Sequence, residues 1–214
     1  MGISLTKGST VIDAIEIDIN FSSSNSEDII IPIDIYTREV LRGRLYINAD
    51  PGAAFSAWAT YTFYNKAAMR GEDAFYRAEA KLVYTELEAA TTGTNASITP
   101  DDHTDFNPHD LAYILDSGDE EFIRLMTIAD TMVAEDTIDA HSINDGLARV
   151  VEFADFQLFN NENANKVYLR ISFVSTQTVS LHMQLLVRQK AYGVLSDELG
   201  KTFQFENGID IDLE

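Results

Sequence analysis

Apolar side chains recur at every second position along much of this 214-residue chain. This period is typical of β-strands that bury one face, because successive side chains on a strand point to opposite sides of the sheet. Two late segments show it most clearly, with the apolar odd positions Val167, Leu169, Ile171 and Phe173 in the first and Val179, Leu181, Met183, Leu185 and Val187 in the second. The pattern predicts an all-β fold.

About eight segments have this character, and their number favours a two-sheet antiparallel β-sandwich, of jelly-roll type if the connections are Greek keys. They span residues 11–21, 29–36, 40–48, 55–64, 74–88, 147–160, 167–173 and 179–187. Pro32 predicts that the second segment is an edge strand, because proline cannot donate a hydrogen bond to a neighbour. The polar residues 175–178 predict a hairpin that makes the last two strands neighbours.

Residues 106–136 depart from the alternation. Phe122, Met126, Ala129 and Val133 share one stripe at helical period, and Asp116 offers a capping side chain ahead of them. We therefore expect a helical insertion near residues 106–136, between the fifth and sixth strands. The absence of a flexible linker predicts one domain over residues 1–200 that includes this insertion.

The charge excludes several classes of partner. Thirty-five acidic residues against 15 basic ones give a formal net charge of −20, which argues against binding to nucleic acid or to an anionic membrane surface. No apolar stretch has the length of a membrane span. The first residues lack the apolar core of a signal peptide, so Sec-type export is not expected. Without cysteine there is no disulfide, thiol nucleophile or zinc–thiolate site.

The best metal candidate is an acidic loop with Asp101, Asp102 and Asp105, followed by His109. Carboxylates and imidazoles are metal ligands, but the loop lacks the spacing of an EF-hand or of a zinc hydrolase. A solvated loop is the favoured interpretation, and no metal or other cofactor is predicted. A nucleophile elbow and a phosphate-binding glycine loop are also missing from the sequence, so we do not expect an enzyme.

The aromatic strand 55–64 has two interpretations. Alternation places Trp58 and Tyr64 on one face and Phe55, Tyr61 and Phe63 on the other. Trp58 and Tyr64 would stack on sugar rings in a carbohydrate-binding module, whereas in a structural protein they would meet a neighbouring subunit. The single tryptophan favours the second interpretation, a core face backed by an interface.

The end of the chain, residues 201–214, alternates in the same way and is expected to be an arm or edge strand that docks on a neighbouring subunit. Its apolar positions are Phe203, Phe205, Ile209, Ile211 and Leu213.

These features together favour a structural protein that forms a large homo-oligomer, with a virion capsid or capsid-associated protein as the leading instance. Its partners would be copies of itself and other particle proteins. The alternatives are a carbohydrate- or ligand-binding module and a phage tail or baseplate component. The expected location is the virion, with the cytoplasm as the alternative.

Overall fold

A computed structural model describes residues 4–6, 11–22, 26–32, 38–64, 68–116, 118, 120–158, 166–189, 194–196 and 202–204. The regular secondary structure of this part of the chain is almost entirely β-strand, which confirms the all-β prediction. Its one helical element is a single 3-10 turn, η1 (Gly71–Asp73). The described residues contain no helix that is long and apolar enough to cross a membrane.

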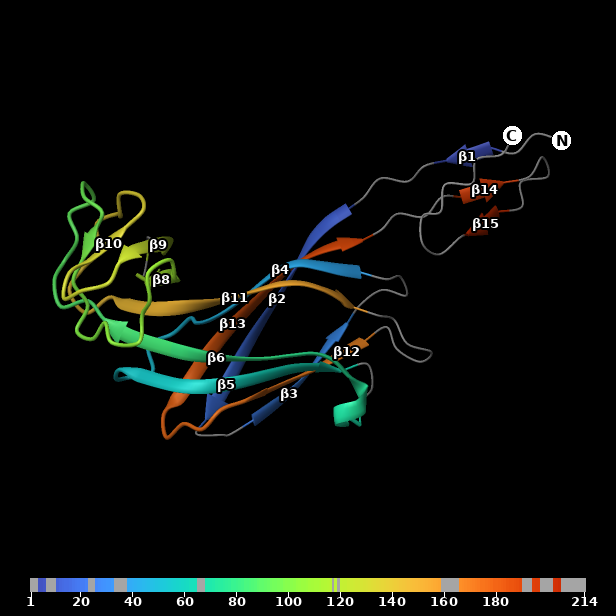
Figure 1. The fold of residues 1–214 in the computed structure, drawn as a ribbon, viewed down its shortest axis with the longest axis horizontal. Coiled ribbons are helices and arrows are strands. Elements are labelled where there is room, and N and C mark those ends of the chain that lie inside the picture. The colour runs from blue at the N-terminus through green and yellow to red at the C-terminus, as the bar shows by residue number, and fades with distance from the viewer. Residues whose placement is uncertain are drawn as a thin grey trace.

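Eight long strands correspond to the eight alternating segments (Figure 1). They are β2 (Val11–Ser22), β3 (Ser26–Pro32), β4 (Arg38–Ile47), β5 (Phe55–Tyr64), β6 (Ala74–Glu86), β11 (Gly146–Leu158), β12 (Lys166–Ser172) and β13 (Thr178–Gln189). All pairings are antiparallel, and the order is β2-β13-β4-β11-β6-β5-β12-β3. The first of the eight therefore pairs with the last, the second with the seventh, the third with the sixth and the fourth with the fifth.

One hydrophobic core is shared by the run β2-β13-β4-β11 and the run β6-β5-β12-β3. Aromatic rings join the two runs, since the ring centroids of Phe21 and Phe173 lie 4.4 Å apart and those of Tyr61 and Phe153 lie 5.2 Å apart. Phe21 is fully buried, and burial of such a side chain contributes about 2 kcal/mol. The shared core holds the inner faces of the two runs together.

The last two long strands are not neighbours, so the predicted hairpin at residues 175–178 is wrong. β12 pairs with β3 and β5, whereas β13 pairs with β2 and β4. The predicted faces are nevertheless correct, because Leu169 and Ile171 of β12 and Leu181 and Leu185 of β13 are fully buried in the shared core. The residues between them cross from one run to the other. β3 pairs only with β12 among the described strands, in agreement with the edge position predicted from Pro32.

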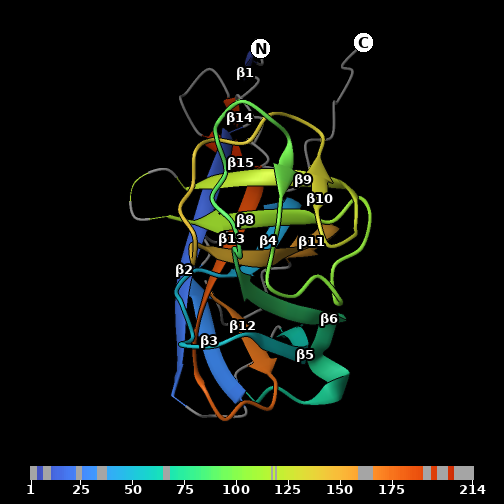
Figure 2. The ribbon, with the colours of Figure 1, turned by 90° about the vertical axis from the view of Figure 1, so that its left-hand side faces the viewer.

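Residues 88–144, named here the insertion lobe, lie between β6 and β11. Their strands are β7 (Ser97–Ile98), β8 (Leu111–Leu115), β9 (Glu121–Thr127) and β10 (Met132–Ala134). They extend the sheet from β11 in the order β8-β9-β10-β7; Figure 2 shows β9, β8, β11, β6 and β5 in succession. The helical insertion predicted for residues 106–136 is therefore wrong.

The stripe that predicted a helix is not buried, since Phe122, Met126 and Val133 are exposed. Instead, β9 buries Ile123 and Leu125 at period two.

β8 also lacks the alternation of a strand, because it is buried on both faces. Ala112 and Ile114 enter the core of the insertion lobe, whereas Leu111 and Tyr113 pack on the other side with Tyr46. A strand buried on both faces has an apolar residue at every position, so its sequence does not alternate. A short apolar run of this kind is as compatible with a helix as with a strand.

The two ends of the insertion lobe meet. The backbone N–H of Leu87 donates to the carbonyl of Asp145 at 2.9 Å, and the N–H of Asn144 donates to the carbonyl of Leu87 at 2.9 Å. The lobe core also includes Val83 of β6 and Leu147 of β11. The chain thus enters and leaves the lobe at neighbouring positions, and the lobe covers the outer side of the strands that carry it.

Three short strands near the chain ends form a second sheet in the order β1-β14-β15 (Figure 1). They are β1 (Ser4–Thr6), β14 (Val194–Ser196) and β15 (Thr202–Gln204), and they lie at the end of the molecule away from the insertion lobe. Phe203 is on β15, paired with Leu195 of β14. Phe205, Ile209, Ile211 and Leu213 of the predicted docking segment lie outside the described residues.

Replacement of Leu185 by aspartate should prevent folding, because this side chain is fully buried and an unpaired charge there would cost several kcal/mol. Leu186→Asp is the matched control, since Leu186 is the next residue of β13 and is 38% exposed. Circular dichroism and soluble yield measure the outcome. A well-folded Leu185→Asp protein would show that the register of β13 is wrong.

Candidate functional site

A groove opens where β6 and β11 separate. The two strands are hydrogen-bonded only over residues 84–86 and 146–148. Beyond this stretch the two strands are no longer paired, and a cavity of about 390 Å³ lies between residues 79–81 and 149–152. Its polar and aromatic lining is Trp58, Tyr61, Glu79, Lys81, His109, Asp110, Arg124, Arg149 and Glu152.

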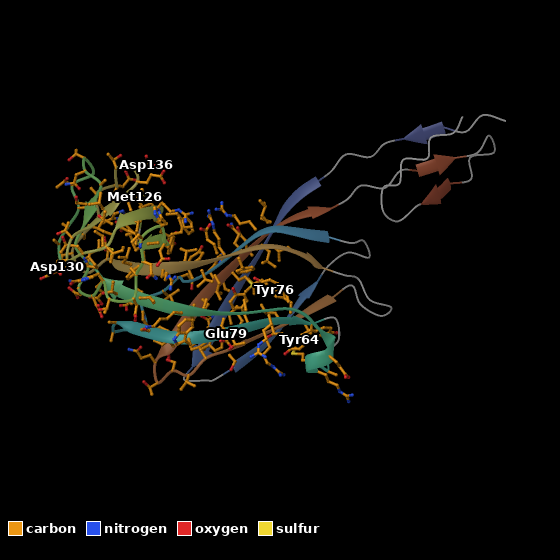
Figure 3. The ribbon with its side chains drawn as sticks, viewed as in Figure 1. Tyr64, Tyr76, Glu79, Met126, Asp130 and Asp136 are labelled. Atoms are coloured by element: carbon orange, nitrogen blue, oxygen red, sulfur yellow. The ribbon has the colours of Figure 1, made fainter. Side chains whose placement is uncertain are left out.

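Trp58 stands at the edge of this groove, on the face of β5 that points away from the core. Its side chain is 67% exposed, whereas Ala59 and Tyr61 are buried. Tyr64, which was predicted to share the stacking surface, is only 8% exposed. It lies six residues further along the strand, about 20 Å away, beside Gly71 of η1 and Ala74 (Figure 3). Trp58 and Tyr64 therefore do not form a common aromatic platform.

Ion pairs fix the charged groups in and around the groove. Arg149 makes a two-pronged contact with Asp110, with Nε 2.8 Å from Oδ2 and Nη2 3.0 Å from Oδ1. Glu152 accepts from Arg124 at 2.8 Å and contacts Arg42 at 2.7 Å. The Asp110 and Glu152 side chains are thus engaged as hydrogen-bond acceptors of arginine side chains. The lining is close to electrically balanced, with Lys81, Arg124 and Arg149 against three carboxylates.

The acidic loop predicted as a metal candidate borders the groove. The Asp105 carboxylate accepts from Lys81 Nζ and, at 2.6 Å, from Ser56 Oγ. These two hydrogen bonds, that of Lys81 first, hold the pKa of Asp105 below its ordinary value. The Thr104 hydroxyl, together with the Thr104 N–H at 2.8 Å, likewise lowers the pKa of Asp102. The Asp102 and Asp105 carboxylates thus accept hydrogen bonds from donors of the chain itself.

The other two predicted ligands have different surroundings. Asp101 is exposed, and its backbone N–H donates to the carbonyl of Glu86 at 2.8 Å. His109 has a left-handed backbone with φ of 72° and lines the groove. The structure therefore brings Asp105, His109 and Trp58 to one region, although the sequence suggested separate roles for them.

A second cluster surrounds His141, in the loop before β11. The His141 ring is fully buried, with Nδ1 3.2 Å from Asp116 Oδ2 and Nε2 3.1 Å from Glu121 Oε1. Asp145 completes a group in which the ligand atoms of Asp116, His141 and Asp145 all lie within 4.8 Å of one another. Sequence reasoning missed this group and gave Asp116 the role of a helix cap. No motif spacing links these residues, because they come from separate segments.

Asp105→Asn should lower the free energy of unfolding by about 1 kcal/mol at neutral pH, because it weakens a partly screened pair with Lys81. Asp105 has a lowered pKa in the folded state, so its contribution is present above its unfolded pKa and is lost as pH falls through the folded value. Urea unfolding between about pH 7 and pH 3 should show the two proteins converging. Exposed Asp101→Asn is the control, and an equal loss there would contradict the assignment.

Comparison with protein-family models, with curated protein sequences and with solved structures gives no match for this chain. Any statement of function therefore depends on the chain's own residues. Those residues supply two candidate sites, the balanced groove beside Trp58 and the buried cluster around His141.

Proposed function

We propose that this chain is a jelly-roll building block of a large homo-oligomeric assembly, with a virion capsid or capsid-associated protein as the leading instance. The observation that carries this proposal is the pairing of the eight long strands. In a jelly roll an antiparallel ribbon is wound into two four-stranded sheets, so that the first strand pairs with the last and the second with the last but one. The pairs β2–β13, β3–β12, β4–β11 and β5–β6 fit that scheme, and viral capsids are among its known uses.

The strands at the chain ends support an assembly role. In the described part of the chain, β15 pairs on one side only, with β14. A free strand edge is a template for pairing with another chain, and a small three-stranded sheet buries little surface by itself. A neighbouring subunit that adds to β15 would extend this sheet and cover the apolar residues of the segment 201–214.

The net charge of −20 opposes such association. Salt screens repulsion between exposed carboxylates but does not weaken apolar burial. Assembly through the chain ends should therefore become stronger as the salt concentration rises.

Deletion of residues 201–214 should leave the eight-stranded domain folded and abolish assembly, because it removes the docking strand. Sedimentation velocity and electron microscopy in low and high salt measure the effect, with circular dichroism as the check on folding. The full-length chain is the matched control and should form larger particles in high salt. Normal assembly of the truncated protein at every salt concentration would contradict this role for the segment.

The groove beside Trp58 favours a second candidate function, the binding of a neutral saccharide. An exposed indole offers a flat apolar surface to a sugar ring, and the fixed carboxylates and guanidinium groups offer acceptors and donors to hydroxyl groups. The near balance of charge in the lining disfavours a strongly acidic or basic ligand. Lectin domains also use the jelly-roll fold, so this function is compatible with the same architecture.

Trp58→Ala should reduce saccharide affinity at least about tenfold, which is the loss expected when a central aromatic contact is removed. Glycan-array binding by the wild-type protein, followed by calorimetry on the best ligand, provides the measurement. Val174→Ala is the control, because Val174 is 76% exposed and lies outside the groove. Failure of the wild-type protein to bind any glycan would remove this second candidate.

A further inference from the structure

We propose that Asp116, His141 and Asp145 bind a divalent transition-metal ion such as Zn²⁺, and that Glu121 positions the imidazole. The three ligand side chains come from two segments, the residue after β8 and the loop before β11. Their ligand atoms lie within 4.8 Å of one another. Atoms bound to one tetrahedral zinc ion are about 3.3 to 3.6 Å apart, so side-chain movements on the order of 1 Å would complete the site. This site does not depend on the proposed function.

The donor set selects the class of metal. One imidazole nitrogen with two carboxylates suits Zn²⁺ and similar ions, whereas Ca²⁺ and Mg²⁺ prefer all-oxygen surroundings. Three protein ligands leave a further coordination position for water or for another donor.

The position of Glu121 matches the outer shell of a metal site. Its Oε1 lies 3.1 Å from His141 Nε2 and also accepts the backbone N–H of Asp139 at 3.0 Å. A histidine that binds metal through one nitrogen usually donates the other N–H to a carboxylate, which fixes the ring and its tautomer. Glu121 contacts Nε2, the ring nitrogen remote from Asp116, so Nδ1 remains directed at the proposed ion.

The charge around the buried ring also favours a cation. Asp116, Glu121 and Asp145 carry three formal negative charges, and a fully protonated His141 would neutralise only one of them. In the described part of the chain, neither lysine nor arginine forms a salt bridge with these three carboxylates. A divalent ion bound to the neutral imidazole would neutralise two of the three charges, in a place where solvent screening is weak.

The backbone around the site is held in place by hydrogen bonds, including two with Thr91 near the start of the insertion lobe. The Thr91 N–H donates to the carbonyl of His141 at 3.0 Å, and the His141 N–H donates to Thr91 Oγ1 at 2.7 Å. Asn144 has a left-handed φ of 70°, and the next residue, Asp145, accepts the Ser142 N–H at 2.6 Å. A bound ion would therefore tie the end of β8 to the start of β11.

Isothermal calorimetry with Zn²⁺ and thermal melting of the full chain test the proposal. We expect one Zn²⁺ per chain, and a melting temperature raised by about 5 to 10 °C when free Zn²⁺ is one hundred times Kd. Mg²⁺ at the same concentration should give a much smaller shift. In spectra of protein labelled with ¹⁵N in histidine, Zn²⁺ should move the Nδ1 resonance of His141, a measurement that needs no ligand variant.

Asp116→Asn and Asp145→Asn should abolish stoichiometric binding, and Glu121→Gln should weaken it about 10- to 100-fold. Asp130→Asn and Asp136→Asn are matched controls, because both residues are exposed acids on the same lobe (Figure 3), and they should bind Zn²⁺ as the wild type does. The proposal is overturned if the wild type takes up no Zn²⁺ or if the Asp116 and Asp145 variants bind it normally. Binding that is lost in His109→Ala but retained in those variants would also overturn it, because the ion would then lie in the acidic loop.

Discussion

The change of hydrogen-bonding partners along β11 organises the rest of the structure. One edge of this strand pairs with β8 over residues 146–150 and with β4 over residues 151–158, while the other edge pairs with β6 over residues 146–148 only. β11 therefore joins the insertion lobe to both four-stranded runs. The groove lies where β6 leaves β11, and the His141 loop lies where β11 begins. Both candidate sites depend on the course of this one strand.

Much of the fold could be predicted because burial of one sheet face requires alternation. Leu169 and Ile171 of β12 and the odd positions 179–185 of β13 entered the core as expected, and Pro32 correctly indicated an edge strand. The partner of each strand could not be predicted in this way, since alternation specifies a face and not a neighbour. Residues 175–178 therefore looked like a hairpin turn, although β12 pairs with β3 and β5 whereas β13 pairs with β2 and β4.

The candidate sites were less predictable because they are built from distant segments. Trp58 could be placed on an outer face by alternation alone, but the burial of Tyr64 depends on η1, which follows β5 in the chain. The His141 cluster forms only if β8 and β9 are strands. The sequence did not identify them as strands, because β8 is apolar on both faces and does not alternate. Once those strands are in place, Asp116 and Glu121 contact His141, although they precede it in the chain by 25 and 20 residues.

The hydrogen bonds that join Leu87 to Asn144 and Asp145 allow the insertion lobe to change in length during evolution. Since its two ends meet where β6 and β11 are adjacent, a short turn could connect these strands directly, and the lobe amounts to an enlarged hairpin loop. Descendants of such a chain can lengthen, shorten or replace the lobe while the eight-stranded core keeps its pairing. Loss of the lobe would expose the residues that it covers, Val83 and Leu147 in its core and Tyr46 and Val150 on the other side of β8. In relatives that lack the lobe, polar residues should therefore occupy these four positions.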